Sequence, residues 1–228
     1  NSNYTLNLVN KFGLKKPLIK KIYPGVINND KVKEKQNNLI EGNPVILTLA
    51  RLEKRKGHIY ILNSLQSLIK EFDNLKYVIA GEGPEKNYLK NQVIKMKLQN
   101  NVIFLGKVDE AEKKYIFSKT DLMVMPTIDE SINRSIEGFG IAYIESALNG
   151  IPSIASNIGG TAEAVIHNKT GIIIDSIEEL EMALRDLLTN KEKRIKLGLA
   201  AKKRAQNEFQ WNDITKEYIS LIKKITIN

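Results

Sequence analysis

The sequence predicts an α/β protein built on a doubly wound parallel sheet. Short apolar runs of strand length alternate with stretches of helical periodicity, and short connections join them, as in repeated βα units. The run Val45–Ala50 is almost entirely apolar, which is typical of a strand covered by helices on both faces. With 228 residues, 42% of them apolar, the chain can bury a substantial core. We therefore predict one Rossmann-like domain over residues 1–228, with C-terminal helices over residues 191–228.

Six or seven strands are predicted along the chain. The uncertain one is Ile19–Tyr23, which the turn residues Pro24 and Gly25 close. Residues 28–43 are polar and are predicted to form a loop. The other predicted strands are Val45–Ala50, Tyr77–Ala80, Val102–Leu105, Leu122–Met125, Ser153–Ala155 and Gly171–Ile174.

Helical patterns follow most of these strands. Pro84 suits a first helical position, Asp109 is expected to cap a helix, and Asn149-Gly150 is expected to end one. Trp211 is expected to anchor the last helix to the core. The predicted helices cover about Gly57–Phe72, Pro84–Leu98, Gly138–Leu148, Thr161–Ile166, Ile177–Leu188, Lys191–Glu208 and Trp211–Ile225.

Composition excludes several classes of protein. The chain has no cysteine, so disulfides, thiolate metal sites and cysteine nucleophiles are excluded. His58 and His167 lie far apart, which argues against a zinc site, and we expect both to be packing or helix-end residues. The net charge of +9 could attract nucleic acid, anionic lipid or phosphorylated small molecules. However, the lysines are scattered, and no nucleic-acid-binding signature or apolar run long enough to span a bilayer is apparent.

Two cations follow the strand Val45–Ala50 at the edge of the predicted sheet where ligands bind. In doubly wound sheets this edge is the carboxyl end of the strands, here the loops after residues 50, 80, 105, 126, 155 and 174. Arg51 follows its strand directly, and Lys56 stands just before a predicted helix. An arginine fork and a lysine point charge near a helix N-terminus are suited to a diphosphate. The alternative is solvated surface charge.

Two carboxylates flank the start of a predicted helix in the stretch Glu137-Gly-Phe-Gly-Ile-Ala-Tyr-Ile-Glu145. Gly138 and Gly140 leave the first N–H groups of that helix open, and such groups attract phosphate. On an ideal helix the two glutamates would lie about 12 Å apart in height and roughly 80° apart around the axis, too far to share a proton. We expect Glu137 in the turn before the helix and Glu145 on its second turn, where they suit two hydroxyl groups of one ligand. Unrelated surface carboxylates are the alternative.

A second glycine pair, Gly159-Gly160, precedes the helix predicted at Thr161–Ile166. It could let backbone approach a ligand, and a plain turn would explain it equally well. Glu163 would then lie near the site if Gly160 does.

Several motifs occur in a fixed order over nearly all of the chain. They are Arg51-Leu-Glu-Lys-Arg-Lys56-Gly-His, Gly81-Glu-Gly-Pro84, Gly106-Lys-Val108, Met125-Pro-Thr127, Glu137-Gly-Phe-Gly…Glu145-Ser-Ala, Gly150-Ile-Pro-Ser and Gly159-Gly-Thr-Ala-Glu163. Together they resemble the donor-binding signature of the group 1 retaining glycosyltransferases. Members of this family have the GT-B fold, in which two Rossmann-like domains face a cleft, and the chain is similar to the C-terminal, donor-binding half. Residues 1–26 then resemble the interdomain crossover and first strand.

The resemblance implies three catalytic candidates. Arg51 and Lys56 would hold the donor diphosphate and stabilise the charge that develops on the leaving group. Glu137 would contact hydroxyl groups of the transferred hexose.

The resemblance also implies donor-binding residues. Gly138, Phe139 and Gly140 would present backbone N–H groups to phosphate and sugar. Glu145 would bind the ribose hydroxyl groups, and backbone near Val108 would meet the nucleobase.

Further expectations concern substrates and partners. The family generally needs no metal or other cofactor, because lysine and arginine replace the cation; the co-substrate would be GDP-mannose or a UDP-sugar. The stretch Ile128–Ile136 resembles the mannosyltransferase-like branch, which acts on lipid-linked or phosphoinositol-type acceptors. The acceptor would be a glycan or a lipid-linked molecule in polysaccharide or glycolipid biosynthesis.

The resemblance also makes the protein's own N-terminal domain a partner. That domain normally supplies the acceptor site and a histidine that neither His58 nor His167 matches, so the fragment alone should bind donor weakly and transfer little. We expect a cytoplasmic protein, with peripheral contact to the inner membrane face as a further option and no nucleic-acid partner. The competing hypothesis is a non-catalytic nucleotide- or polyanion-binding module. A third alternative is an epimerase or phosphorylase relative with the same fold, although a phosphorylase would need a pyridoxal-binding lysine context that is not found.

Overall fold

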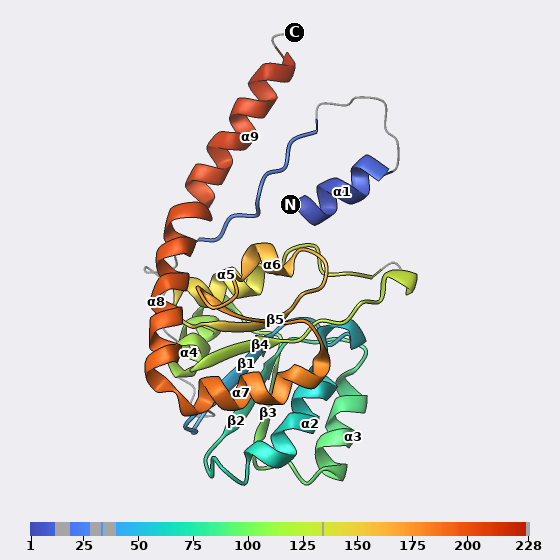
Figure 1. Cartoon of the computed structure of the whole chain (residues 1–228), viewed down its shortest axis with the longest axis vertical. Helices are drawn as coiled ribbons and strands as arrows, with labels where there is room; N and C mark the ends of the chain where they lie inside the picture. Colours follow the sequence, from blue (N-terminus) through green and yellow to red (C-terminus); the bar gives the residue numbers. More distant parts are fainter. Residues whose placement is uncertain (12–18, 28–32, 34–39, 134, 227–228) are drawn as a thin grey trace.

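A single parallel sheet organises the protein. The structure is a computed structural model that describes residues 1–11, 19–27, 33, 40–133 and 135–226. Within these residues six strands pair in the order β3-β2-β1-β4-β5-β6, which confirms the predicted doubly wound parallel sheet (Figure 1). The strands are β1 (Val45–Leu49), β2 (Lys76–Ala80), β3 (Val102–Gly106), β4 (Leu122–Met125), β5 (Ser153–Ser156) and β6 (Gly171–Ile174).

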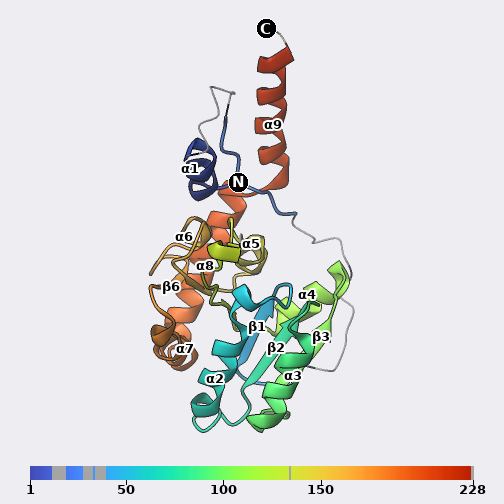
Figure 2. The ribbon, with the colours of Figure 1, turned by 90° about the vertical axis from the view of Figure 1, so that its right-hand side faces the viewer.

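Helices cover both faces of the sheet (Figures 1 and 2). On β1, Ile46 belongs to the buried cluster under α2 (His58–Leu68), α3 (Lys86–Lys95) and α7 (Leu180–Thr189). Val45 and Leu47 belong to the cluster under α4 (Glu110–Lys119), α5 (Ile141–Leu148) and α8 (Lys191–Glu208). This alternation of neighbouring side chains between two apolar layers explains why the strand reads as almost continuously apolar. The helices are α1 (Asn3–Lys11), α2 (His58–Leu68), α3 (Lys86–Lys95), α4 (Glu110–Lys119), α5 (Ile141–Leu148), α6 (Thr161–Ala164), α7 (Leu180–Thr189), α8 (Lys191–Glu208) and α9 (Trp211–Thr226), with short 3-10 turns η1 (Lys54–Lys56), η2 (Ser131–Asn133) and η3 (Ile177–Glu179).

The predicted helix cap at Asp109 is present and is part of a reciprocal capping box. The Asp109 carboxylate accepts from the Glu112 amide at 2.8 Å, and the Glu112 carboxylate accepts from the Asp109 amide at 2.9 Å. Two amides at the start of α4 are thereby satisfied, so the cap fixes where α4 begins after β3.

Two sequence predictions near the N-terminus and around Gly138 need correction. Residues 19–27 contain no strand, so the predicted strand Ile19–Tyr23 is wrong; Val26 forms only an isolated parallel bridge with Gln210. Helix α5 begins at Ile141 rather than near Gly138, because Gly140 has a φ of 90° and stands outside the helix. Most of the predicted loop 28–43 lies outside the described residues.

Trp211 does not anchor the last helix to the core, contrary to the prediction. Its side chain is exposed and its ring lies over Gly25, where a Cβ atom would stand 2.3 Å from Trp211 Cε3. The buried anchor is Phe209, whose ring packs against those of Tyr23 and Phe139 at centroid distances of 5.4 and 5.6 Å. Beyond it, α9 extends away from the sheet (Figures 1 and 2). Among the described helices, α9 included, none is long and apolar enough to cross a membrane.

Candidate functional site

The order of the strands places the topological switch point of the sheet between β1 and β4. From β1 the chain adds β2 and β3 on one side of the sheet and β4, β5 and β6 on the other, so the connections diverge above the β1–β4 pair. The loops that follow these two strands touch: the Ile128 amide donates to the Arg55 carbonyl at 2.9 Å. Gly57, with a φ of 73°, packs so closely that a Cβ atom would lie 2.0 Å from the Pro126 carbonyl oxygen. The candidate site is built on this contact.

Two largely buried cations meet one carboxylate beside these loops. The Lys56 ammonium and the Arg55 guanidinium both donate to the same oxygen of Glu137, the arginine at 2.9 Å. Arg55 also donates to Glu53 at 3.0 Å. Burial alone would raise the pKa of Glu137, but the adjacent Lys56 and Arg55 charges hold that pKa below its ordinary value. Glu137 is therefore an ionised group held by two cations.

The structure places Arg51 apart from this cluster. Its guanidinium pairs with Glu53 at 2.8 Å, and its side chain is 73% exposed, against 10% for Lys56. The cation that joins Lys56 on Glu137 is Arg55, which the sequence analysis does not single out. The sequence feature that could have identified Arg55 is its position directly before Lys56, in the same short turn.

A glycine loop leads from Glu137 into helix α5. Gly140 adopts a left-handed backbone at the N-cap position, and no side chain caps the helix there. The Phe139 ring is buried against Tyr23 and Phe209, so only the Phe139 backbone can face a ligand. The first amides of a helix have no carbonyl partner within the helix, so the Gly138–Gly140 loop and α5 form an anion-attracting end beside Lys56.

The second glycine pair, Gly159-Gly160, packs against the backbone of Glu137 and Gly138. The Gly160 amide donates to the Glu137 carbonyl at 2.9 Å. A Cβ atom on Gly159 would lie 2.1 Å from that same carbonyl oxygen, and one on Gly160 would lie 2.1 Å from the Gly138 carbonyl oxygen. Backbone therefore approaches backbone at both positions, which explains the pair structurally without any ligand.

Glu145 lies on the second turn of α5 and faces α4. It accepts from the Lys113 ammonium at 2.8 Å, and Lys113 also pairs with Glu110 at 2.9 Å. Burial opposes the charge on Lys113, but its hydrogen bonds to both glutamates prevail and raise the Lys113 pKa. Glu137 and Glu145 thus bind different cations, on η1 and on α4, and do not form an acid–base couple with each other.

Two further features lie at strand ends. Val108, the residue proposed to lie near a nucleobase, lines a small pocket of about 110 Å³. Thr127, two residues after the end of β4, is buried, and its hydroxyl group has no hydrogen-bond partner among the described residues. A buried hydroxyl without a hydrogen-bond partner is uncommon in native proteins, and the sequence analysis did not single out Thr127. The Val108 pocket is completed by Ile40, Phe104, Leu105, Glu112, Tyr115 and Ile116.

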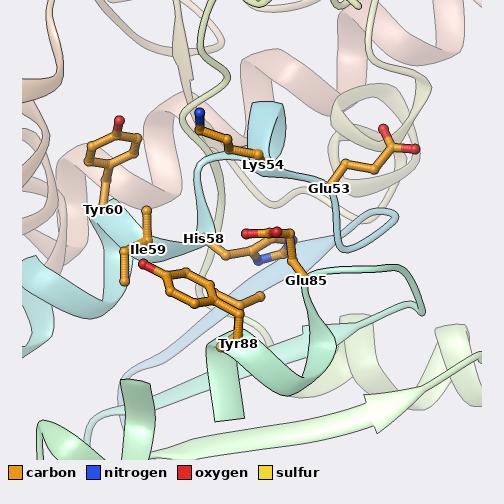
Figure 3. Close-up of a pocket in the computed structure, with 8 residues that line it drawn as sticks. Glu53, Lys54, His58, Ile59, Tyr60, Glu85 and Tyr88 are labelled. Carbon is orange, nitrogen blue, oxygen red and sulfur yellow. The ribbon is translucent and has the colours of Figure 1, made fainter. Parts of the chain in front are cut away.

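A larger pocket of about 310 Å³ lies between α2 and α3, beside the η1 turn. Figure 3 shows Glu85 and Tyr88 on the α3 side and His58, Ile59 and Tyr60 on the α2 side. Neither Lys56 nor Glu137 lines it, but Glu53, which pairs with Arg55, does, so this pocket adjoins the ion-pair cluster.

His58 is a packing residue, as predicted. Its side chain is 2% exposed, and Nδ1 lies 2.9 Å from the Tyr77 hydroxyl group. Within the described part of the chain Nε2 has no hydrogen-bond partner. Burial lowers the pKa of His58 from 6.5 to about 4, so the ring is neutral near pH 7.

This buried histidine predicts acid sensitivity. The unfolded chain binds the His58 proton more tightly than the folded chain does. Neutral His58 therefore makes its full contribution to the free energy of unfolding above about pH 6.5, and this contribution is lost as the pH falls towards about 4. The pKa difference between the unfolded and folded states corresponds to about 3 kcal/mol of stability, of which about 2 kcal/mol should be lost by about pH 5. Urea unfolding at about pH 7.5 and about pH 5 measures it. The variant His58→Asn should be less stable near pH 7 but lose less on acidification, and equal losses in both proteins would contradict the assignment.

Comparison with known proteins identifies the family of this chain. The profile of the family Glycosyl transferases group 1 matches residues 29–204, and the chain belongs to this family. It is 28% identical over 182 residues to the GDP-mannose-dependent alpha-(1-6)-phosphatidylinositol monomannoside mannosyltransferase of Mycobacterium tuberculosis, covering 79% of this chain and 47% of the relative. The chain thus spans about half the length of the curated relatives it matches. These findings make the protein part of a hexosyltransferase family.

Solved structures agree on the fold. Anabaena Alr3699/HepE, in complex with UDP and glucose, superposes with a TM-score of 0.83 at 21% identity, covering 98% of this chain and 61% of that chain. A glycosyltransferase from Rickettsia africae gives a TM-score of 0.84 at 22% identity, with coverages of 100% and 62%. The Rossmann-like half of a GT-B fold, which the sequence predicts, is confirmed. Among the described residues no group of three or more histidine or acidic side chains could hold a metal ion.

Proposed function

We propose that this chain binds the nucleoside diphosphate sugar of a retaining hexosyltransferase, across the loops that follow β1 and β4. The observation that carries the proposal is the convergence of Lys56 and Arg55 on a single oxygen of Glu137. Together with Arg51, these cations face only two carboxylates, Glu137 and Glu53, so the cluster keeps one net positive charge, which favours a further anion. The adjacent glycine loop and start of α5 favour the same ligand charge.

Each part of the donor has a matching group in this arrangement. Lys56 and Arg55 bind the diphosphate, and Arg51 joins them by exchanging its exposed pair with Glu53 for a phosphate oxygen. Preorganised cations stabilise the charge that develops on the departing diphosphate, which is their catalytic contribution. Glu137 is then free to accept from hexose hydroxyl groups.

The nucleoside lies on the α4 side of the site. Glu145 accepts from the ribose hydroxyl groups, and the backbone at Val108 meets the base. The Gly138–Gly140 amides bind phosphate and sugar. Fixed lysine and arginine charges neutralise the diphosphate here, which is the role that a metal ion would otherwise have.

The donor is a nucleoside diphosphate hexose; the mannosyltransferase relatives carry GDP-mannose in their names, and HepE was solved with UDP and glucose. The acceptor is a glycan or lipid-linked molecule, and binding it is assigned to an N-terminal domain that faces this one. The proposed location is the cytoplasmic side of the membrane, with peripheral contact favoured by the net charge of +9.

Calorimetry of this chain with UDP, GDP and ADP, and then with their sugars, tests the proposal. At least one nucleoside diphosphate should bind with a Kd of about 1 mM or tighter. Inorganic pyrophosphate serves as the matched probe for charge alone and should bind more weakly, because it lacks ribose and base. A folded protein that binds none of these ligands would overturn the donor assignment, and equal binding of pyrophosphate would favour the polyanion-binding module.

A further inference from the structure

Glu163 contacts a distant part of the chain at the edge of the candidate site. Its two carboxylate oxygens accept from the backbone amides of Asn3 at 2.9 Å and Tyr4 at 3.1 Å. These are the first two residues of helix α1, and 160 and 159 positions separate them from Glu163. The start of α1 lies beside α6 in both views (Figures 1 and 2).

Together with Ser2, Glu163 satisfies the start of α1 completely. The first amides of a helix lack carbonyl partners and are normally capped by a nearby side chain. The Ser2 hydroxyl accepts from the Thr5 amide at 3.0 Å, and the Ser2 carbonyl accepts from the Leu6 amide at 3.0 Å. The two remaining amides are those that Glu163 binds, so a distant carboxylate completes a local cap.

The rest of α1 offers little to hold it in place. The helix has nine residues, and none of them is buried. Isolated helices of this length are unstable in water, and most helices in proteins depend on packing. Five of its residues are half-buried, so the contacts at its first turn add to a weakly packed helix.

The Glu163 carboxylate is itself held by several groups. The Tyr23 hydroxyl donates to it at 3.0 Å, and the Lys21 ammonium lies 3.7 Å away. Arg204 of α8 donates to the Glu163 carbonyl at 2.8 Å and to the Ala164 carbonyl at 2.9 Å, which fixes the short helix α6. Burial alone would raise the pKa of Glu163, but the amides and neighbours that bind the carboxylate hold its pKa below the ordinary value.

Asn1 and Ser2, just before α1, also contact the two glycine loops. Ser2 is fully buried, and a Cβ atom on Gly160 would lie 2.9 Å from Ser2 Cβ. A Cβ atom on Gly138 would lie 3.3 Å from Asn1 Nδ2. Asn1 therefore stands against Gly138, whose backbone the proposed function assigns to sugar and phosphate, and Ser2 stands against Gly160, which packs on that loop.

We propose that Glu163 is a positioning residue, which caps α1 across the fold and seats Asn1–Tyr4 as a wall of the donor site. The cap stands on its own, whereas its effect on the donor rests on the proposed function. Glu163 acts through the segment that it holds and does not itself touch the ligand.

The test compares three single variants of the full chain with the wild type. In Glu163→Gln the side chain has only one acceptor oxygen, so at least one α1 amide is left open. Tyr23→Phe removes one donor to Glu163 and keeps the aromatic packing. Glu192→Gln is the matched control, since Glu192 is an exposed glutamate in the first turn of α8. Hydrogen exchange, the urea midpoint and nucleoside diphosphate affinity are measured on each.

Glu163→Gln should speed hydrogen exchange over residues 3–11 at least about tenfold and leave exchange in α5 and α8 unchanged. The urea midpoint should also stay unchanged. The Kd for GDP or UDP should rise about two- to tenfold. Tyr23→Phe should have a smaller effect in the same direction, and Glu192→Gln none. Unchanged exchange over residues 3–11 in Glu163→Gln would overturn the cap, and so would faster exchange throughout the chain. Faster exchange of α1 with unchanged affinity would overturn the link to the donor site. If the wild type binds no nucleotide, the proposed function fails, while the exchange measurement still decides the cap.

Discussion

Replacing Lys56 by methionine is expected to raise the Kd for the bound nucleoside diphosphate about 10- to 150-fold. Lys56 is the most buried cation of the cluster, and a charged hydrogen bond to a diphosphate oxygen contributes about 1.5–3 kcal/mol. Methionine keeps most of the volume, so the change removes charge rather than packing. Calorimetry with GDP and UDP measures the effect, and urea unfolding records any change in stability separately.

Lys54→Met is the matched control for that prediction. Lys54 lies in the same η1 turn, but its side chain is 70% exposed and its carboxylate neighbour, Glu130, is 3.5 Å away. Exposed pairs of this kind contribute about 0–1 kcal/mol, so the affinity should hardly change. If both variants bind as the wild type does, Lys56 does not hold the phosphates. If both weaken equally, the effect is one of general positive charge.

Replacing Gly160 by alanine is expected to impair both stability and nucleotide binding. The backbone at Gly160 has a φ of −98°, which alanine adopts readily, so the effect is steric. The new Cβ atom would stand 2.1 Å from the Gly138 carbonyl oxygen and must displace the glycine loop. We expect a loss of about 1–3 kcal/mol in the free energy of unfolding, as for other overpacked sites. The displaced Gly138 should also weaken nucleoside diphosphate binding.

Gly150→Ala separates steric displacement from backbone strain. Gly150 has a φ of 76°, which alanine disfavours by about 1–2 kcal/mol, but the nearest atom to a new Cβ is Lys202 Cδ at 3.9 Å. This variant should therefore lose stability and keep its affinity. Unaltered nucleotide affinity in a folded Gly160→Ala protein would show that the Gly138 backbone is not part of the binding site.

Local chemistry made much of the fold predictable. Strand-length apolar runs identified all six strands of the sheet, and β4 and β6 agree with their predicted bounds. Asp109 was recognisable as a cap because a carboxylate that precedes a helix satisfies open amides whatever the rest of the protein does. Helix α5 was placed too early because its apolar periodicity hides the left-handed backbone of Gly140. Trp211 was misjudged because residue type gives an average tendency to burial, whereas the actual surroundings of α9 decide it.

The sequence by itself determined the class of sheet, the edge at which the charged loops gather, and the family to which the chain belongs. These follow from periodicity and motif spacing, which are local properties. Only the tertiary structure decided the partners of the site residues: Arg55 rather than Arg51 on Glu137, 82 positions away, and Lys113 on Glu145. The cap that Glu163 places on α1 is of the same kind. Such pairs depend on how loops from different strands meet in space, and a charge in sequence does not specify which of several nearby opposite charges it will bind.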